Sequence, residues 1–169
     1  VLGSGKTLTE AMYKGFIAAG LRLKKDGGVF ISVKDSDKPE IAEIGRQFMD
    51  LGFEIYATDG TAEVLMENGV AANVVTRMPK DERSAAEGAE SGYRVRSAME
   101  LIDDGTLSYI VSTSSKGRLP ESESVKLRRR GTVAGIDCLT SLDTANAMLE
   151  CLRSEYNEGT VGLVDINTL

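Results

Sequence analysis

The sequence predicts an α/β fold: an open, mainly parallel five-stranded sheet with helices on both faces, in the Rossmann-like three-layer arrangement. Two observations predict it. Short apolar segments rich in β-branched residues alternate, through short loops, with longer segments whose apolar residues recur every three or four positions. The 169 residues, 41% hydrophobic and 27% charged, also suffice for one domain with a full core. Parallel strands joined by right-handed helical crossovers satisfy this alternation.

The N-terminal segment predicts one helix followed by a linker. Apolar residues recur at helical spacing over residues 7–21, whereas residues 24–28 are polar and end in two glycines. We therefore expect residues 1–27 to be a helix and linker that precede a main domain of residues 28–169. Because the chain begins at Val1 rather than Met, we also expect it to be a piece of a longer protein.

The main domain opens with a buried strand and a helix. Residues 29–33 are apolar and mostly β-branched, and residues 36–39 combine capping side chains with a proline in the first helical turn. An apolar stripe then continues this helix until Gly52 ends it. The later strands are expected over 53–57, 72–75, 107–112 and 132–138, with an edge strand over 160–165, and the later helices over 60–68, 93–104, 121–130 and 141–153, with a long loop over 76–92.

Composition excludes several kinds of site and partner. Histidine is absent, so no Ser-His-Asp triad and no histidine metal site can form. The two cysteines, Cys138 and Cys151, are too few for a four-thiolate zinc site, and we expect them to be reduced, buried thiols. The net charge of -6 argues against a nucleic-acid partner. No stretch has the roughly 18 apolar residues of a membrane span, and no signal peptide is recognisable.

Hydroxyl-rich loops after two predicted strands indicate an anion site. In such sheets, ligands bind beyond the carboxyl ends of the strands. Hydroxyls, a glycine at a helix start and nearby cations are what a phosphate group needs there. The expected cradle is Thr58, Gly60 and Thr61, closed by Thr113 and Ser114 from a neighbouring strand, with Lys38 and Arg77 at the rim. The alternative is that these hydroxyls only cap helices, as we expect Asp59 to do.

Two further motifs have simpler interpretations. Residues 3–7, Gly-Ser-Gly-Lys-Thr, look like the end of a P-loop but lack its first glycine and leading strand, so we predict a glycine turn that starts a helix. Residues 126–130, Lys-Leu-Arg-Arg-Arg, form a basic run on a predicted helix. This run is either a solvated face, a contact with a partner domain, or a source of field that attracts anions.

Three segments together carry a family resemblance. They are residues 29–33 (Val-Phe-Ile-Ser-Val) with Asp37 and Lys38, residues 53–62 (Phe-Glu-Ile-Tyr-Ala-Thr-Asp-Gly-Thr-Ala), and residues 109–114 (Tyr-Ile-Val-Ser-Thr-Ser). The chain resembles the methylglyoxal-synthase-like fold and, more narrowly, the C-terminal allosteric domain of the carbamoyl phosphate synthetase large subunit. The resemblance covers residues 28–165, and residues 3–19 resemble the end of the preceding ATP-grasp half.

The resemblance implies a non-catalytic domain that binds nucleotide effectors. Uridine and inosine monophosphates act on some members of the family, and a phosphoribosyl pyrophosphate activator acts on others. The positions that match the family's effector site are Lys38, Thr58, Thr61, Arg77, Ser112, Thr113 and Ser114. Three of them depart from the family pattern: Ser112 replaces an asparagine that could read a base or ribose, Arg77 replaces a lysine, and Ser114 replaces a threonine, which is a mild change. The departures concern which effector binds.

The resemblance also implies partners and a setting. These are the rest of the large subunit, the small glutaminase subunit, ornithine at the domain boundary and a cytoplasmic enzyme of arginine or pyrimidine synthesis. ATP and Mg²⁺ or Mn²⁺ would belong to the parent enzyme, and no cofactor or metal is expected in this chain. Self-association is a further possibility, because an excised domain exposes surfaces that its neighbours covered.

Three alternatives remain open. A methylglyoxal synthase would use aspartates in a Gly-Gly-Asp loop and after the fourth strand, together with a histidine. Here residues 78–83 read Met-Pro-Lys-Asp-Glu-Arg, and residues 113–115 read Thr-Ser-Ser. An inosinate cyclohydrolase domain would need a lysine- and histidine-bearing segment that is missing. The third alternative is a structural or oligomerisation module with a vestigial pocket.

Overall fold

The computed structural model describes residues 1–79, 95–113, 122–163 and 165, and within them it shows one five-stranded parallel sheet. The strand order is β3-β2-β1-β4-β5. The strands are β1 (Gly28–Ser32), β2 (Glu54–Ala57), β3 (Asn73–Val74), β4 (Leu107–Ser112) and β5 (Asp137–Leu139). The chain moves outward from β1 on one side and then returns to its other side, so the strand order reverses between β1 and β4.

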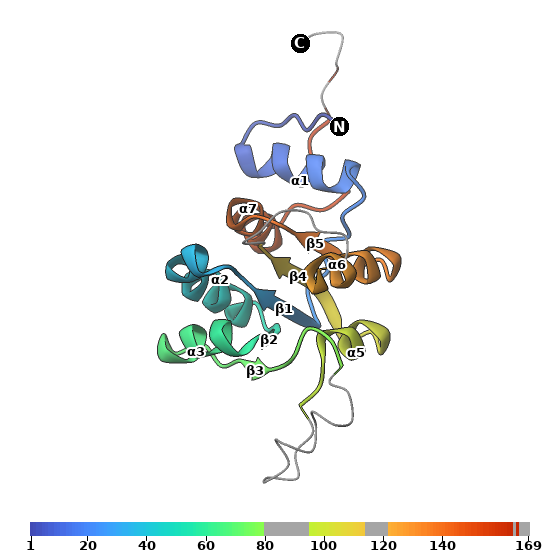
Figure 1. The fold of residues 1–169 in the computed structure, drawn as a ribbon. Coiled ribbons are helices and arrows are strands. Elements are labelled where there is room, and N and C mark those ends of the chain that lie inside the picture. Colours follow the sequence, from blue (N-terminus) through green and yellow to red (C-terminus); the bar gives the residue numbers. More distant parts are fainter. Residues whose placement is uncertain (80–94, 114–121, 164, 166–169) are drawn as a thin grey trace.

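Helices cover both faces of this sheet (Figure 1). On one face lie α2 (Lys38–Asp50), α3 (Asp59–Glu67) and α7 (Leu142–Arg153), with α1 (Leu8–Ala18) packed against α7. On the other face lie α5 (Ala98–Asp103) and α6 (Glu123–Val133). A short 3₁₀ turn, η1 (Asp35–Asp37), leads from β1 into α2. The predicted three-layer α/β fold is confirmed, and all the pairings found are parallel.

An aromatic trio anchors the larger of the two cores. Phe48 of α2 packs edge-on against Phe53, with ring centroids 5.6 Å apart, and lies 6.2 Å from the ring of Tyr109 on β4. All three rings are buried. The Tyr109 hydroxyl donates a 2.7 Å hydrogen bond to the carbonyl of Lys24, so the predicted linker is fastened to the central sheet. The expected domain boundary after residue 27 stays a prediction.

The end of α6 differs from the prediction. A strand was expected over 132–138, but α6 continues to Val133 and β5 covers only Asp137–Leu139. Gly131, the residue after the predicted helix 121–130, lies inside α6 where it touches the sheet. A Cβ there would lie 2.6 Å from Cδ1 of Ile110. This glycine is therefore a contact between helix and strand, not a stop.

Other boundaries also moved. Asp37 is the N-cap of α2 without a side-chain capping bond, so the predicted capping at residues 36–39 is wrong, although Pro39 does lie in the first turn. The helix expected from residue 93 begins at Ala98, where Ser97 and Glu100 form a capping box. The edge strand expected over 160–165 is absent from its described residues, which form turns and coil. Both cysteines are free as predicted, with Cys151 buried and Cys138 half-buried.

A buried ion pair joins the two ends of the chain. Glu10 of α1 is only 5% exposed and accepts hydrogen bonds from the backbone N–H groups of Lys6 and Gly162. Lys14 lies 3.0 Å from the Glu10 carboxylate and donates to the carbonyls of Ser4 and Gly162. Thr7 caps α1, as predicted for a glycine turn that starts a helix. No helix in the described ranges is long and apolar enough to cross a membrane.

This arrangement predicts acid sensitivity. Hydrogen bonds from Lys14, Lys6 and Gly162 outweigh burial and lower the pKa of Glu10 from 4.5 to about 2. Because folding depresses this pKa, its stabilising effect is complete above pH 4.5 and is lost as the pH falls toward 2. In denaturant titrations at pH 7 and pH 3, we expect the wild type to lose more stability than Glu10→Gln. Equal losses in both proteins would contradict the assignment.

Candidate functional site

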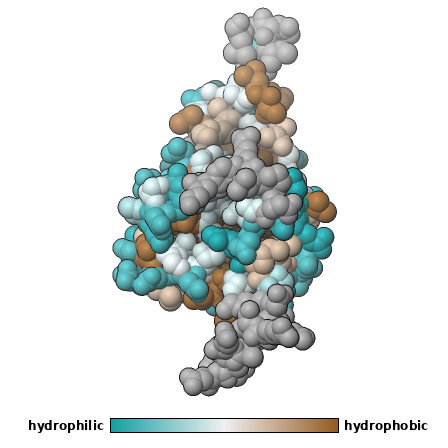
Figure 2. All heavy atoms as spheres, in the orientation of Figure 1, coloured by the Kyte–Doolittle hydropathy of each residue, from teal (hydrophilic) through white to brown (hydrophobic). Residues whose placement is uncertain are grey.

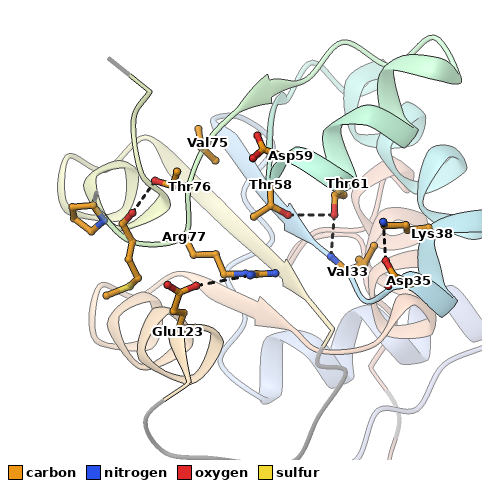
Figure 3. A pocket seen from close by; sticks show the side chains of 13 residues that line it. Val33, Asp35, Lys38, Thr58, Asp59, Thr61, Val75, Thr76, Arg77 and Glu123 are labelled. Atoms are coloured by element: carbon orange, nitrogen blue, oxygen red, sulfur yellow. Dashed lines mark hydrogen bonds and ion pairs between the residues drawn. The ribbon is translucent and has the colours of Figure 1, made fainter. Parts of the chain in front are cut away.

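A cavity of about 500 Å³ opens at the carboxyl ends of β1, β2 and β3 (Figure 3). Its walls come from the β1–α2 connection, the first turn of α3, the segment after β3 and the first residue of α6. The lining residues are Val33, Asp35, Lys38, Thr58, Asp59, Gly60, Thr61, Val75, Thr76, Arg77, Met78, Pro79 and Glu123. Lys38, Thr58, Gly60, Thr61 and Arg77, all predicted from the sequence, therefore share one cavity.

The hydroxyls of Ser32, Thr58 and Thr61 lie close together at one side of this cavity. Thr58 and Thr61 line the cavity itself. Thr58 Oγ1 lies 3.3 Å from Ser32 Oγ and 3.4 Å from Thr61 Oγ1, and Thr61 Oγ1 accepts a 3.4 Å bond from the Val33 N–H. These distances are long for hydroxyl bonds, which are usually about 2.7–2.8 Å. The hydroxyls are thus weakly engaged with one another and can redirect toward an anion.

Thr58 is the N-cap residue of α3, yet its side chain makes no capping bond. The alternative that its hydroxyl only caps the helix is therefore not what the structure shows. Asp59 was expected to cap instead, and this is wrong, because Asp59 is the first helical residue. Its carboxylate points away from Arg77 in Figure 3.

Two cations flank the hydroxyls from opposite sides (Figure 3). Arg77 follows β3 and donates two hydrogen bonds to Ser32 Oγ, 3.1 Å from Nε and 2.7 Å from Nη2. Lys38 is the first residue of α2, and its ammonium group lies close to Gly60. A Cβ atom added to Gly60 would lie only 3.3 Å from Nζ of Lys38. Glycine at this position therefore lets the lysine approach the start of α3. Lys38 also pairs with Asp35 at 2.7 Å, but the Asp35 side chain is 93% exposed, so this pair is weak.

Ser112 and Thr113, also predicted as site residues, do not line this cavity. Ser112 is buried at the end of β4, in register with Ser32. Thr113 lines a second cavity of about 280 Å³, and its hydroxyl accepts a 3.0 Å bond from the Lys34 N–H. Ser114 and residues 80–83 lie outside the described residues. The effector-binding role of Ser112, Thr113 and Ser114 stays a prediction.

The wall between the two cavities is the 3₁₀ turn η1. Burial alone would raise the pKa of Asp37, but hydrogen bonds from Thr113, Ser36 and Lys34 lower it below its ordinary value. Asp37 is therefore a carboxylate that ties this turn to the end of β4. Two residues of this turn line different cavities: Asp35 lines the cavity of about 500 Å³, and Asp37 lines the cavity of about 280 Å³.

Sequence reasoning missed the two residues that contact Arg77. Ser32, which holds Arg77 and contacts Thr58, is a polar residue at the carboxyl end of an apolar strand, and this was a usable signal. Glu123 lies 3.9 Å from Arg77 Nη1, and nothing in the sequence relates two residues so far apart. Among the described residues, no group of three or more histidines, cysteines or carboxylates is placed to hold a metal ion.

Comparison with known proteins places the chain in a family. The family model for the MGS-like domain matches residues 40–140. The chain belongs to the MGS-like domain family. The matched region of this MGS-like domain runs from the first turn of α2 to just after β5, so it includes Thr58, Thr61, Arg77 and Glu123 but not Ser32 or Lys38.

The MGS-like domain is also similar to a longer protein and to a solved structure. It is 38% identical to the carbamoyl phosphate synthase large chain of Lachnoclostridium phytofermentans over 165 residues, which are 98% of this chain but only 14% of that protein. The crystal structure of methylglyoxal synthase from Elizabethkingia anophelis NUHP1 matches with a TM-score of 0.51 at 13% identity, covering 74% of this chain and 78% of that one. At this identity, the structural likeness shows the fold alone.

Proposed function

We propose that this MGS-like domain is a regulatory domain of a carbamoyl phosphate synthase large chain and binds a phosphorylated nucleotide, of the uridine or inosine monophosphate kind, in the cavity of about 500 Å³. The observation that carries the proposal is the convergence of Thr58, Thr61, Lys38 and Arg77 on one cavity. The likeness to a carbamoyl phosphate synthase large chain supports the regulatory role.

The cavity suits a phosphate group for three physical reasons. The first N–H groups of α3 have no partner within the helix, and the helix dipole makes this end attractive to anions. The hydroxyls of Thr58 and Thr61 supply short-range donors, and Lys38 and Arg77 supply charge. A volume of about 500 Å³ also leaves room for more than a phosphate, as a nucleoside requires.

Regulation would follow if the ligand changes how this domain contacts the rest of the enzyme. Allosteric couplings are typically about 1–3 kcal/mol. Exposed apolar side chains gather at the end of the molecule that carries α1 and the N-terminus (Figures 1 and 2). Val1, Leu2 and Leu163 are among the exposed large apolar residues. They fit a contact with the remainder of the large chain. That remainder would bind the ATP and the metal ions, and it would associate with the small glutaminase subunit. The whole enzyme would lie in the cytoplasm. The domain itself would be non-catalytic.

Calorimetric titration of the 169-residue chain tests the proposal. The ligands are uridine monophosphate, inosine monophosphate and phosphoribosyl pyrophosphate, with uridine as the control that lacks a phosphate. We expect saturable binding of at least one phosphorylated compound to a single site and no measurable binding of uridine. No saturable binding by any of the three, or equal binding of uridine, would contradict the proposal.

A further inference from the structure

The Arg77 guanidinium has partners on two sides, and they come from different elements. Nε and Nη2 both donate to Ser32 Oγ at the end of β1, which fixes the orientation of the guanidinium plane. Nη1 lies 3.9 Å from Oε2 of Glu123, the first residue of α6 (Figure 3). Since Nε and Nη2 of the guanidinium are both bonded to Ser32, Nη1 is the nitrogen that faces the Glu123 carboxylate.

The two contacts differ in strength. The bonds to Ser32 are 3.1 and 2.7 Å long and end on a buried oxygen. The contact with Glu123 is beyond hydrogen-bond distance, and its side chains are 36% and 59% exposed. Solvent-exposed pairs of this kind contribute little to stability. Arg77 is therefore firmly held by Ser32 and only loosely held by Glu123.

Glu123 also stands on the wall of the cavity proposed to bind phosphate. A phosphate that bonds to Arg77 Nη1 must come close to this carboxylate, and two anions at such a distance repel each other. Arg–phosphate hydrogen bonds are short and strong, because both partners are charged. We therefore expect the phosphate to displace the Glu123 carboxylate from Arg77, because that carboxylate is not hydrogen-bonded to the guanidinium.

We propose that the Glu123 carboxylate competes with the ligand's phosphate for Arg77. Glu123 thereby weakens the affinity for phosphorylated ligands, and its contact with Arg77 is broken when a ligand binds. The inference rests on the proposed function and adds a residue that sets its affinity. It also ties occupancy of the cavity to α6. At the other end of that helix, Arg130 contacts Asp103 of α5 through Nε and Nη2, each at 2.7 Å. Loss of the Glu123 contact would therefore act on the near end of α6.

Calorimetry on three proteins tests this proposal: the wild type, Glu123→Gln and Glu150→Gln. Glu150 is an exposed residue of α7 outside the cavity, so its variant makes the same change of charge elsewhere. The probe is whichever of uridine monophosphate, inosine monophosphate and phosphoribosyl pyrophosphate binds most tightly. We expect Glu123→Gln to bind it about three- to tenfold more tightly than the wild type, and Glu150→Gln to match the wild type. A thermal unfolding scan without ligand confirms that each variant is folded.

The outcomes separate this inference from the proposed function. Equal affinities for the wild type and Glu123→Gln would overturn the inference and leave the proposed function standing. An equal gain in Glu150→Gln would also overturn it, because the effect would then come from net charge. If none of the three proteins binds any phosphorylated probe, both proposals fail.

Discussion

The Lys38→Ala/Arg77→Ala double variant is expected to bind its best phosphorylated nucleotide at least about 100-fold more weakly than the wild type. Each cation can give the phosphate a charge-assisted hydrogen bond, and the loss of one such bond costs about 1.5–3 kcal/mol. The two residues approach the cavity from different elements, and the double variant removes both bonds to the phosphate at once. The measurement is the calorimetric titration described above, repeated on the variant.

Arg46→Ala is the matched control for this variant. Arg46 lies on α2 outside the cavity, where it pairs with Glu43, so its removal changes the charge without touching the site. We expect it to keep the wild-type affinity. A double variant that is folded by its thermal transition, yet binds within a few-fold of the wild type, would show that the phosphate does not lie between Lys38 and Arg77.

Phe48→Ala is expected to lower the free energy of unfolding by about 3–5 kcal/mol. Phe48 is fully buried and packs against both Phe53 and Tyr109, so truncation leaves a cavity at the centre of the larger core. Domains are usually stable by about 5–15 kcal/mol, so this loss is a large fraction of the total. The effect should reach the site, because Phe48 packs α2 on the sheet and Lys38 is the first residue of that helix.

Urea denaturation at neutral pH measures this effect, with Phe48→Leu as the control. Leucine keeps most of the apolar volume, so we expect it to cost less than about 2 kcal/mol. Losses of similar size in the two variants would contradict the packing described here. A loss below about 1 kcal/mol in Phe48→Ala would show that the core can close around the missing ring.

The order of strands and helices could be predicted from sequence because each element has its own hydrophobic period. The segment 107–112 was predicted to the residue, since most of it is apolar and Gly105 precedes it and Thr113 follows it. The end of α6 could not be predicted in the same way. Gly131 has the same local signature whether it ends a helix or touches a strand, and only the position of Ile110 in space separates these cases.

The site was predictable to the extent that sheet topology determines it. Hydroxyls that follow parallel strands must lie at one edge of the sheet, and this brought Thr58 and Thr61 together with Lys38 and Arg77. Topology does not determine which way a side chain points. Thr113 follows a neighbouring strand, yet it lines the second cavity, and its hydrogen bond to the carboxylate lowers the pKa of Asp37. Glu123 enters the site only through the packing of α6.

We propose that a phosphate binds at the ends of β1 and β2, between Lys38 and Arg77. Mapping the ligand by amide NMR on this 18.1 kDa chain tests it most directly. On addition of the tightest-binding nucleotide, the largest shifts should fall on the first turn of α3 and on Val33 and Arg77. Shifts confined to the outer face of α6 or to the second cavity near Ser141, or no saturable shifts at all, would contradict the claim.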